Sequence, residues 1–111
     1  MSVIVEGRIG PEGGSLYIIL PKSQIAILDA TAMGNHLYLN RVNVPAPHQG
    51  IGLGSRLVAT LIEQAKLAGH ERIIVEPGGY DPSRHDDQIR FYERHGFTKQ
   101  PEGHYALELA H

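Results

Sequence analysis

The chain has 111 residues, a formal net charge of −2 and no cysteine, a size typical of one domain, which we expect to span residues 1–111. It lacks the Lys/Arg runs of a nucleic-acid-binding surface and the roughly 18 consecutive apolar residues of a membrane span, so we expect neither nucleic acid nor a membrane as partner. The missing cysteine excludes disulfides and thiolate chemistry and fits a reducing compartment, which favours a cytoplasmic location.

Short runs of alternating apolar and polar residues predict antiparallel strands in the first part of the chain. Clusters of turn-forming residues separate these runs and favour hairpin connections. The alternation of Leu37, Leu39 and Val42 contains one residue too many, at Asn40 or Arg41, which is what a β-bulge would produce. We expect strands over residues 2–9, 15–20, 24–32 and 36–44, with turns at 10–14, 21–23 and 33–35.

The second half changes to helical spacing. Apolar residues on one face predict an amphipathic helix from residue 53 that ends at Gly69. The short apolar run 72–75 then predicts a buried strand that is reached by a parallel crossover. A loop over 77–83 precedes a second helix over 86–95, which begins at Ser83 or Asp86 and stops at Gly96.

Two closing runs, 97–99 and 104–109, predict a terminal hairpin. The expected fold class is therefore α+β (α/β), with a mixed, mostly antiparallel central sheet of about six to seven strands and two main helices.

A glycine-rich loop lies directly before the first expected helix. Glycine lets the backbone approach bound oxygens closely, and the unsatisfied N–H groups at a helix start favour an anion such as a pyrophosphate. The residues of this loop are Gln49, Gly50, Ile51, Gly52, Leu53, Gly54 and Ser55.

Three kinds of glycine loop, besides an ordinary tight turn, fit such a position to different degrees. A nucleotide-binding P-loop is excluded, because Gly54-Ser55 lacks the required lysine. A dinucleotide fingerprint would place its third glycine at Ser55, although Glu76 lies at about the right distance for the ribose-binding acid. A dinucleotide-binding domain therefore stays open as a weaker alternative.

Two sequence blocks favour a third kind of glycine loop over the P-loop and the dinucleotide fingerprint. Gln49-x-x-Gly52-x-Gly54 follows Val42-x-Val44 and precedes the first helix, and the segment 91–97, FYERHGF, ends the second helix. Together they resemble the acetyl-CoA signature Q/R-x-x-G-x-G/A and the Φ-Tyr-x-x-x-Gly-Phe block of GNAT acetyltransferases, over about residues 37–109. The resemblance implies a truncated GNAT fold and an N-acetyltransferase that moves the acetyl group of acetyl-CoA to a primary amine.

The resemblance also implies roles for individual residues. Tyr92 would protonate the departing thiolate of coenzyme A. The candidate base is Glu76, whose place at the end of the strand between the two helices would let it accept the amine proton directly or through water. Packing alone would also explain Tyr92, and a solvated strand end would also explain Glu76. His48 and His85 are alternative bases, and the histidine spacing predicts no metal site.

The expected cofactor site has three parts. The peptide groups of strand 36–44 near its end should pair with the pantetheine arm, the glycine loop should hold the pyrophosphate, and the second helix should contact the region of the thiol. His85 stands where the family usually has an asparagine. The implied acetyl-CoA contacts are Val42, Asn43, Val44, Gln49, Gly50, Ile51, Gly52, Leu53, Gly54, Ser55, His85 and Tyr92.

The turn at 10–14 is too short for the two helices that the family usually inserts between its first strands. The acceptor side should therefore be open, which suits a protein lysine or N-terminus, or a site completed by the second subunit of a homodimer. The main alternative function is a non-catalytic acyl-CoA-binding or interaction module that uses the same loop.

Overall fold

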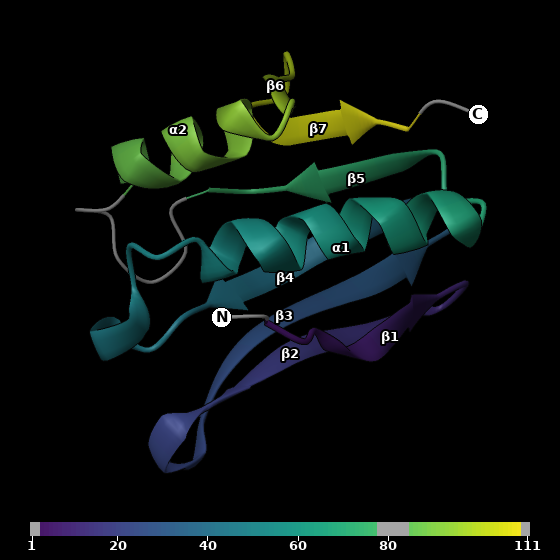
Figure 1. Ribbon diagram of the computed structural model, residues 1–111. Helices are drawn as coiled ribbons and strands as arrows, with labels where there is room; N and C mark the ends of the chain where they lie inside the picture. Colours follow the sequence, from purple (N-terminus) through teal and green to yellow (C-terminus); the bar gives the residue numbers. More distant parts are fainter. Residues whose placement is uncertain (1–2, 78–84, 110–111) are drawn as a thin grey trace.

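The computed structural model describes residues 3–77 and 85–109, with the side chain of His85 left out. Within these ranges a seven-stranded sheet carries two α-helices (Figure 1). No helix there is both long and apolar enough to cross a membrane. The elements in chain order are β1 Glu6–Gly10, β2 Gly13–Leu20, η1 Pro21–Ser23, β3 Gln24–Met33, β4 His36–Asn43, η2 Ala46–His48, α1 Leu53–Leu67, β5 Arg72–Val75, α2 His85–Arg94, β6 Thr98–Lys99 and β7 Tyr105–Glu108.

The strand order is β1-β2-β3-β4-β5-β7-β6, and β4 with β5 is the parallel pair among the described strands. The helix α1 connects these two strands, as a parallel connection requires. The expected α+β class, with a mostly antiparallel sheet of six to seven strands and two main helices, is confirmed.

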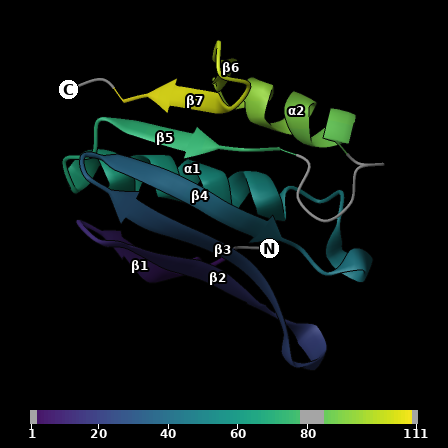
Figure 2. The ribbon, with the colours of Figure 1, turned by 180° about the vertical axis from the view of Figure 1, so that it is seen from behind.

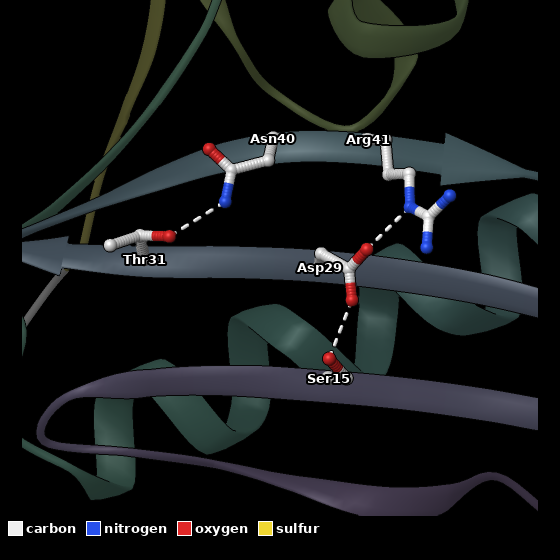
Figure 3. Close-up of polar contacts among 5 residues, drawn as sticks. All are labelled: Ser15, Asp29, Thr31, Asn40 and Arg41. Atoms are coloured by element: carbon white, nitrogen blue, oxygen red, sulfur yellow. Dashed lines mark hydrogen bonds and ion pairs between the residues drawn. The ribbon is translucent and has the colours of Figure 1, made fainter.

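The expected irregularity in β4 is a real β-bulge. Asp29 pairs with Arg41, but the next residue of β3, Ala30, pairs with Leu39, so Asn40 is the extra residue. The side chain of Asn40 donates a hydrogen bond to Thr31 Oγ1 at 2.7 Å, which holds the extra residue against β3 (Figure 3).

One face of the sheet packs against α1. Leu57, Val58 and Leu61 of α1 are fully buried, and burial of each such side chain contributes about 1.5–3 kcal/mol to folding. Polar contacts fix the helix along its axis, since Gln64 accepts a hydrogen bond from the backbone of Ile9 at 2.7 Å. The sheet residues buried on this face include Leu16, Ile18, Ala26, Leu28, Ala30, Leu37, Leu39, Ile73 and Val75.

The opposite face of the sheet is not covered by either described helix, and we call it the open face (Figure 2). Its residues alternate with the buried ones along each strand. Apolar side chains gather at one end, where Ile19 pairs with Ile25 and both are exposed. The expected absence of two helices between the first strands agrees with the β1–β2 connection, which consists of Pro11 and Glu12.

Most element boundaries lie within two residues of expectation, and two expectations were wrong. The first strand begins at Glu6 and not at residue 2, because the alternation of Val3 and Val5 reflects packing against the edge of the core without strand pairing. The second helix begins at His85, so Asp86 lies inside its first turn and does not start it. Ser83 and most of the expected loop 77–83 lie outside the described residues.

The β1–β2 turn generates a prediction about stability. Gly13 has φ +94°, and a Cβ there would lie 2.4 Å from the carbonyl oxygen of Ala30, whereas a Cβ at its register partner Gly10 would meet nothing within 4 Å. We expect Gly13→Ala to lower the free energy of unfolding by on the order of 2 kcal/mol or more, from backbone strain and overlap. Denaturant unfolding would measure this loss, and equal effects of Gly13→Ala and Gly10→Ala would contradict it.

Candidate active site

An opening between β4 and β5 forms the centre of the candidate site. The two strands pair from His36–Arg72 to Leu39–Val75, and beyond this point β5 ends while β4 continues through the bulge to Asn43. The edge of β4 that faced β5 therefore has no strand partner over its last residues in the described chain. Peptide groups on such an edge can pair with an extended molecule as an added strand would.

The start of α1 lies beside this opening (Figure 1). Gly52 precedes the helix in a left-handed conformation with φ 88°, and no side chain caps the helix. The first intrahelical bond runs from the N–H of Arg56 to the carbonyl of Gly52, which leaves the N–H groups of Leu53, Gly54 and Ser55 without an intrahelical acceptor. These groups and the helix dipole favour an anion at this end.

The glycines of the loop leave room for such an anion. A Cβ at Gly50, with φ +82°, or at Gly52 would meet no protein atom within 4 Å. The backbone directly before the helix is therefore open to an approaching ligand at these two glycines. These residues fit the diphosphate of acetyl-CoA, because the backbone can approach its oxygens without a side chain in between.

Side chains of the loop hold its shape. Gln49 Nε2 donates a hydrogen bond to the carbonyl oxygen of Val44 at 2.9 Å, which ties the loop to the end of β4. His48 contacts the side chain of Gln24 at the start of β3, with 2.9 Å between Nε2 and Oε1. The side chain of Gln49 thus supports the protein backbone, and its predicted contact with the cofactor stays a prediction.

The second sequence block meets the first at the start of α1. The ring of Phe91 lies 3.4 Å from the position that a Cβ on Gly54 would occupy, and Val42 lies 3.9 Å from the same point. Directly after α2, His95 lies close to the same place, with 3.1 Å between its Nε2 and Ser55 Oγ. Burial and the neighbouring Arg94 lower the pKa of His95, so this imidazole is neutral at pH 7.

Tyr92 lies in the aromatic cluster at the inner side of α2. Its ring packs edge-on against Phe91 and Phe97, with centroids 5.2 and 5.6 Å apart, and 7% of its surface is exposed. Burial raises the pKa of Tyr92 to about 12, so the phenol keeps its proton at neutral and moderately alkaline pH. The hydroxyl is thus suited to donate a proton or a hydrogen bond.

Glu76 directly follows β5, one of the two strands that border the opening. It alternates with Val75 and shares the open face with Ile74 and Tyr38, which are neighbours in the parallel ladder. The hydroxyl of Tyr38 lies close to Glu76, and burial together with the charge of this carboxylate raises the pKa of Tyr38. Glu76 also borders a pocket of about 360 Å³ whose lining includes Ile89 and Tyr105.

The structure thus brings Val42, the glycine loop and α2 together, and Glu76 directly follows β5, which borders the opening. The predicted role of His85 rests on a side chain outside the described residues. Sequence reasoning missed Tyr38 and the contact between His95 and Ser55. The outward position of Tyr38 follows from its place between buried Leu37 and Leu39, but its partner depends on the register of β4 with β5.

Comparison with known proteins gives the family. A model of the acetyltransferase (GNAT) family matches residues 13–97. The chain belongs to this family. It is therefore an acetyl-CoA-dependent acyltransferase, with acetyl-CoA as its cosubstrate. A search of curated proteins finds no match.

Solved structures of other acetyltransferases share the fold. An IAA acetyltransferase from Bacillus cereus is 17% identical with a TM-score of 0.77, over 97% of this chain and 100% of that one. The ribosomal-protein-S18-alanine N-acetyltransferase of Escherichia coli is 18% identical with a TM-score of 0.69, over 92% and 72%. An acetyltransferase of Bacillus anthracis in complex with acetyl coenzyme A is 18% identical with a TM-score of 0.74, over 90% and 65%.

The two helix-start glycines of this GNAT protein should respond differently to alanine. At Gly54 the added methyl would make ordinary contact with Phe91, so we expect Gly54→Ala to keep the fold and acetyl-CoA binding. At Gly52 alanine would strain the left-handed backbone by about 1 kcal/mol and place a methyl in the anion space, so acetyl-CoA binding should weaken. Titration calorimetry with both variants would check this, and equal affinities would contradict it.

Proposed function

We propose that this protein is an N-acetyltransferase that transfers the acetyl group of acetyl-CoA to a primary amine, with Tyr92 as general acid and Glu76 as general base. The convergence of Val42, Gly54 and Phe91 beside the β4–β5 opening carries the proposal, because it joins both sequence blocks in one place. In this proposal the Tyr92 hydroxyl would act from α2 and the Glu76 carboxylate from the end of β5.

The cofactor would follow the opening. The N–H groups at Leu53, Gly54 and Ser55 would hold the diphosphate, with Gly50 and Gly52 providing space. The unpaired edge of β4 at Val42 and Asn43, together with Val44 directly after the strand, would bind the pantetheine arm as an added strand. The proposed set of acetyl-CoA contacts also includes Ile51, Gln49, His85 and Tyr92.

The reaction needs three proton movements. A lysine-like amine with a pKa of about 10.4 is neutral in roughly one molecule per thousand at pH 7, so loss of its proton to Glu76 makes attack possible. The amine nitrogen then forms a bond to the acetyl carbon and loses its second proton to water as the carbon–sulfur bond breaks. The electron pair leaves with sulfur, which takes a proton from Tyr92.

The acceptor would enter from the open face. No described helix covers this face, which leaves room for a polypeptide (Figure 2). A protein lysine or N-terminus is therefore our proposed acceptor class, and a second subunit completing the site in a homodimer is the alternative use of the same space. A cytoplasmic location accompanies the proposal, since the chain has no cysteine.

Replacement of the acid separates an enzyme from a binding module. Tyr92→Phe keeps the aromatic packing but removes the hydroxyl, so we expect kcat to fall about 100-fold while acetyl-CoA still stabilises the protein. At 100 times the dissociation constant the ligand should add about 2.7 kcal/mol in both proteins. Because the pKa of Tyr92 is about 12, the wild-type rate should show no loss from its deprotonation up to pH 10.

Thermal unfolding with acetyl-CoA, NAD and ATP, followed by acetylation kinetics, would measure these quantities. Stabilisation by NAD alone would favour a dinucleotide-binding domain. Stabilisation by acetyl-CoA without transfer to any amine would favour the non-catalytic acyl-CoA-binding module.

Replacement of Glu76 tests its proposed role as general base. We expect Glu76→Gln to lower kcat/KM for the amine by on the order of 100-fold at pH 7. The decrease in kcat/KM should be smaller at high pH, because more of the amine is already neutral there. Glu93→Gln, at an exposed position of α2, is the matched control. An unchanged pH–rate profile in Glu76→Gln would remove Glu76 from the mechanism.

A further inference from the structure

An arginine on the open face is held in a fixed position beside the candidate site. Arg41 Nε donates a hydrogen bond to Asp29, and Asp29 also accepts one from the hydroxyl of Ser15 at 2.5 Å (Figure 3). The three residues come from β4, β3 and β2, so they form a chain of contacts across the sheet. We call this chain the Arg41 relay.

The acid of the relay is charged. Burial alone would raise the pKa of Asp29, but the hydrogen bonds from Ser15 and Arg41 and the positive charge of Arg41 outweigh burial and lower the pKa below its ordinary value. Asp29 is therefore ionised at neutral pH and orients the guanidinium.

Arg41 has N–H donors besides the one at Nε that Asp29 accepts. Asp29 engages Nε, and Figure 3 draws no contact from the two terminal nitrogens of Arg41 to the other residues in the view. The side chain of Arg41 is 57% exposed, against 24% for Asp29. A guanidinium carries five N–H donors, and its terminal pair matches the geometry of a carboxylate.

The bulge places this arginine near the proposed base. Leu39 is the last residue of β4 that pairs with β5, opposite Val75, and Arg41 and Glu76 each follow shortly after this pair on the open face. A regular ladder with about 3.3 Å per strand residue and about 4.8 Å between strands would place their α-carbons about 6 Å apart, and the end of strand pairing after Leu39 and Val75 widens this to roughly 10 Å. One amine-bearing molecule can reach both side chains.

We infer that the acceptor carries a carboxylate close to the amine that is acetylated. Glu76 faces the amine, and the terminal nitrogens of Arg41 bind the carboxylate. The pair of opposite charges at this spacing complements a molecule with a cationic and an anionic end. This inference rests on the proposed function, and it narrows the acceptor to a free amino acid or to a peptide amine beside an acidic residue.

Matched acceptors test the inference. Each pair differs only in a carboxylate: a peptide with N-terminal Asp against one with N-terminal Asn, a peptide with Lys-Asp against Lys-Asn, and free glycine against glycinamide. We expect kcat/KM for the wild-type protein to favour at least one acid form by on the order of 10-fold or more. The preferred pair identifies the source of the carboxylate.

Variants of this chain then test whether Arg41 causes the preference for the acid form of the acceptor. Arg41→Gln should bring the acid-to-amide ratio of kcat/KM close to one, while acetyl-CoA stabilisation stays at the wild-type value. Arg8→Gln, at an exposed position of β1, should keep the wild-type ratio. Because the ratio is compared between variants, the different amine pKa values within a pair cancel.

Three outcomes would overturn the inference. A wild-type ratio near one in every pair, or a high ratio that Arg41→Gln leaves unchanged, removes Arg41 from acceptor recognition while acetyl transfer itself stands. Acetyl-CoA binding without acetylation of any amine removes the inference together with the proposed transferase function.

Discussion

The separation of β4 from β5 is the constraint on which the site depends. A regular parallel ladder would close the sheet at this point and satisfy every peptide group. The extra residue Asn40 donates a hydrogen bond to Thr31, which keeps β4 paired with β3. The strand β5 ends after Val75. The result is a sheet that is continuous at one end and open at the other, directly beside the start of α1.

This opening divides the chemistry between two environments. On the helix side, Phe91, Phe97 and the core surround Tyr92 and keep its phenol protonated. On the open side, Glu76 and Arg41 remain accessible to water and to an acceptor. A buried acid and solvent-exposed charged groups can thus serve one reaction although they belong to opposite faces of the same sheet.

The sequence was sufficient to predict the helices and strands, but it was not sufficient to predict which side chains meet across neighbouring strands. Periodicity revealed α1, β5 and even the bulge, because hydrophobic alternation records burial directly. The first strand was misplaced for the same reason, since Val3 and Val5 are partly buried without pairing. Contacts such as Tyr38 with Glu76 and Arg41 with Asp29 depend on register between strands, which one sequence does not encode locally.

The connections along the chain also order its folding. The strands β1 to β4 follow one another through short turns, so their pairings join residues that are close in sequence. The pairing of β5 with β4 must instead close a long segment that contains the whole of α1. Local contacts form faster than distant ones. We therefore expect a nascent chain to build its four-stranded meander early and to acquire a working acetyltransferase site only in its final folding step.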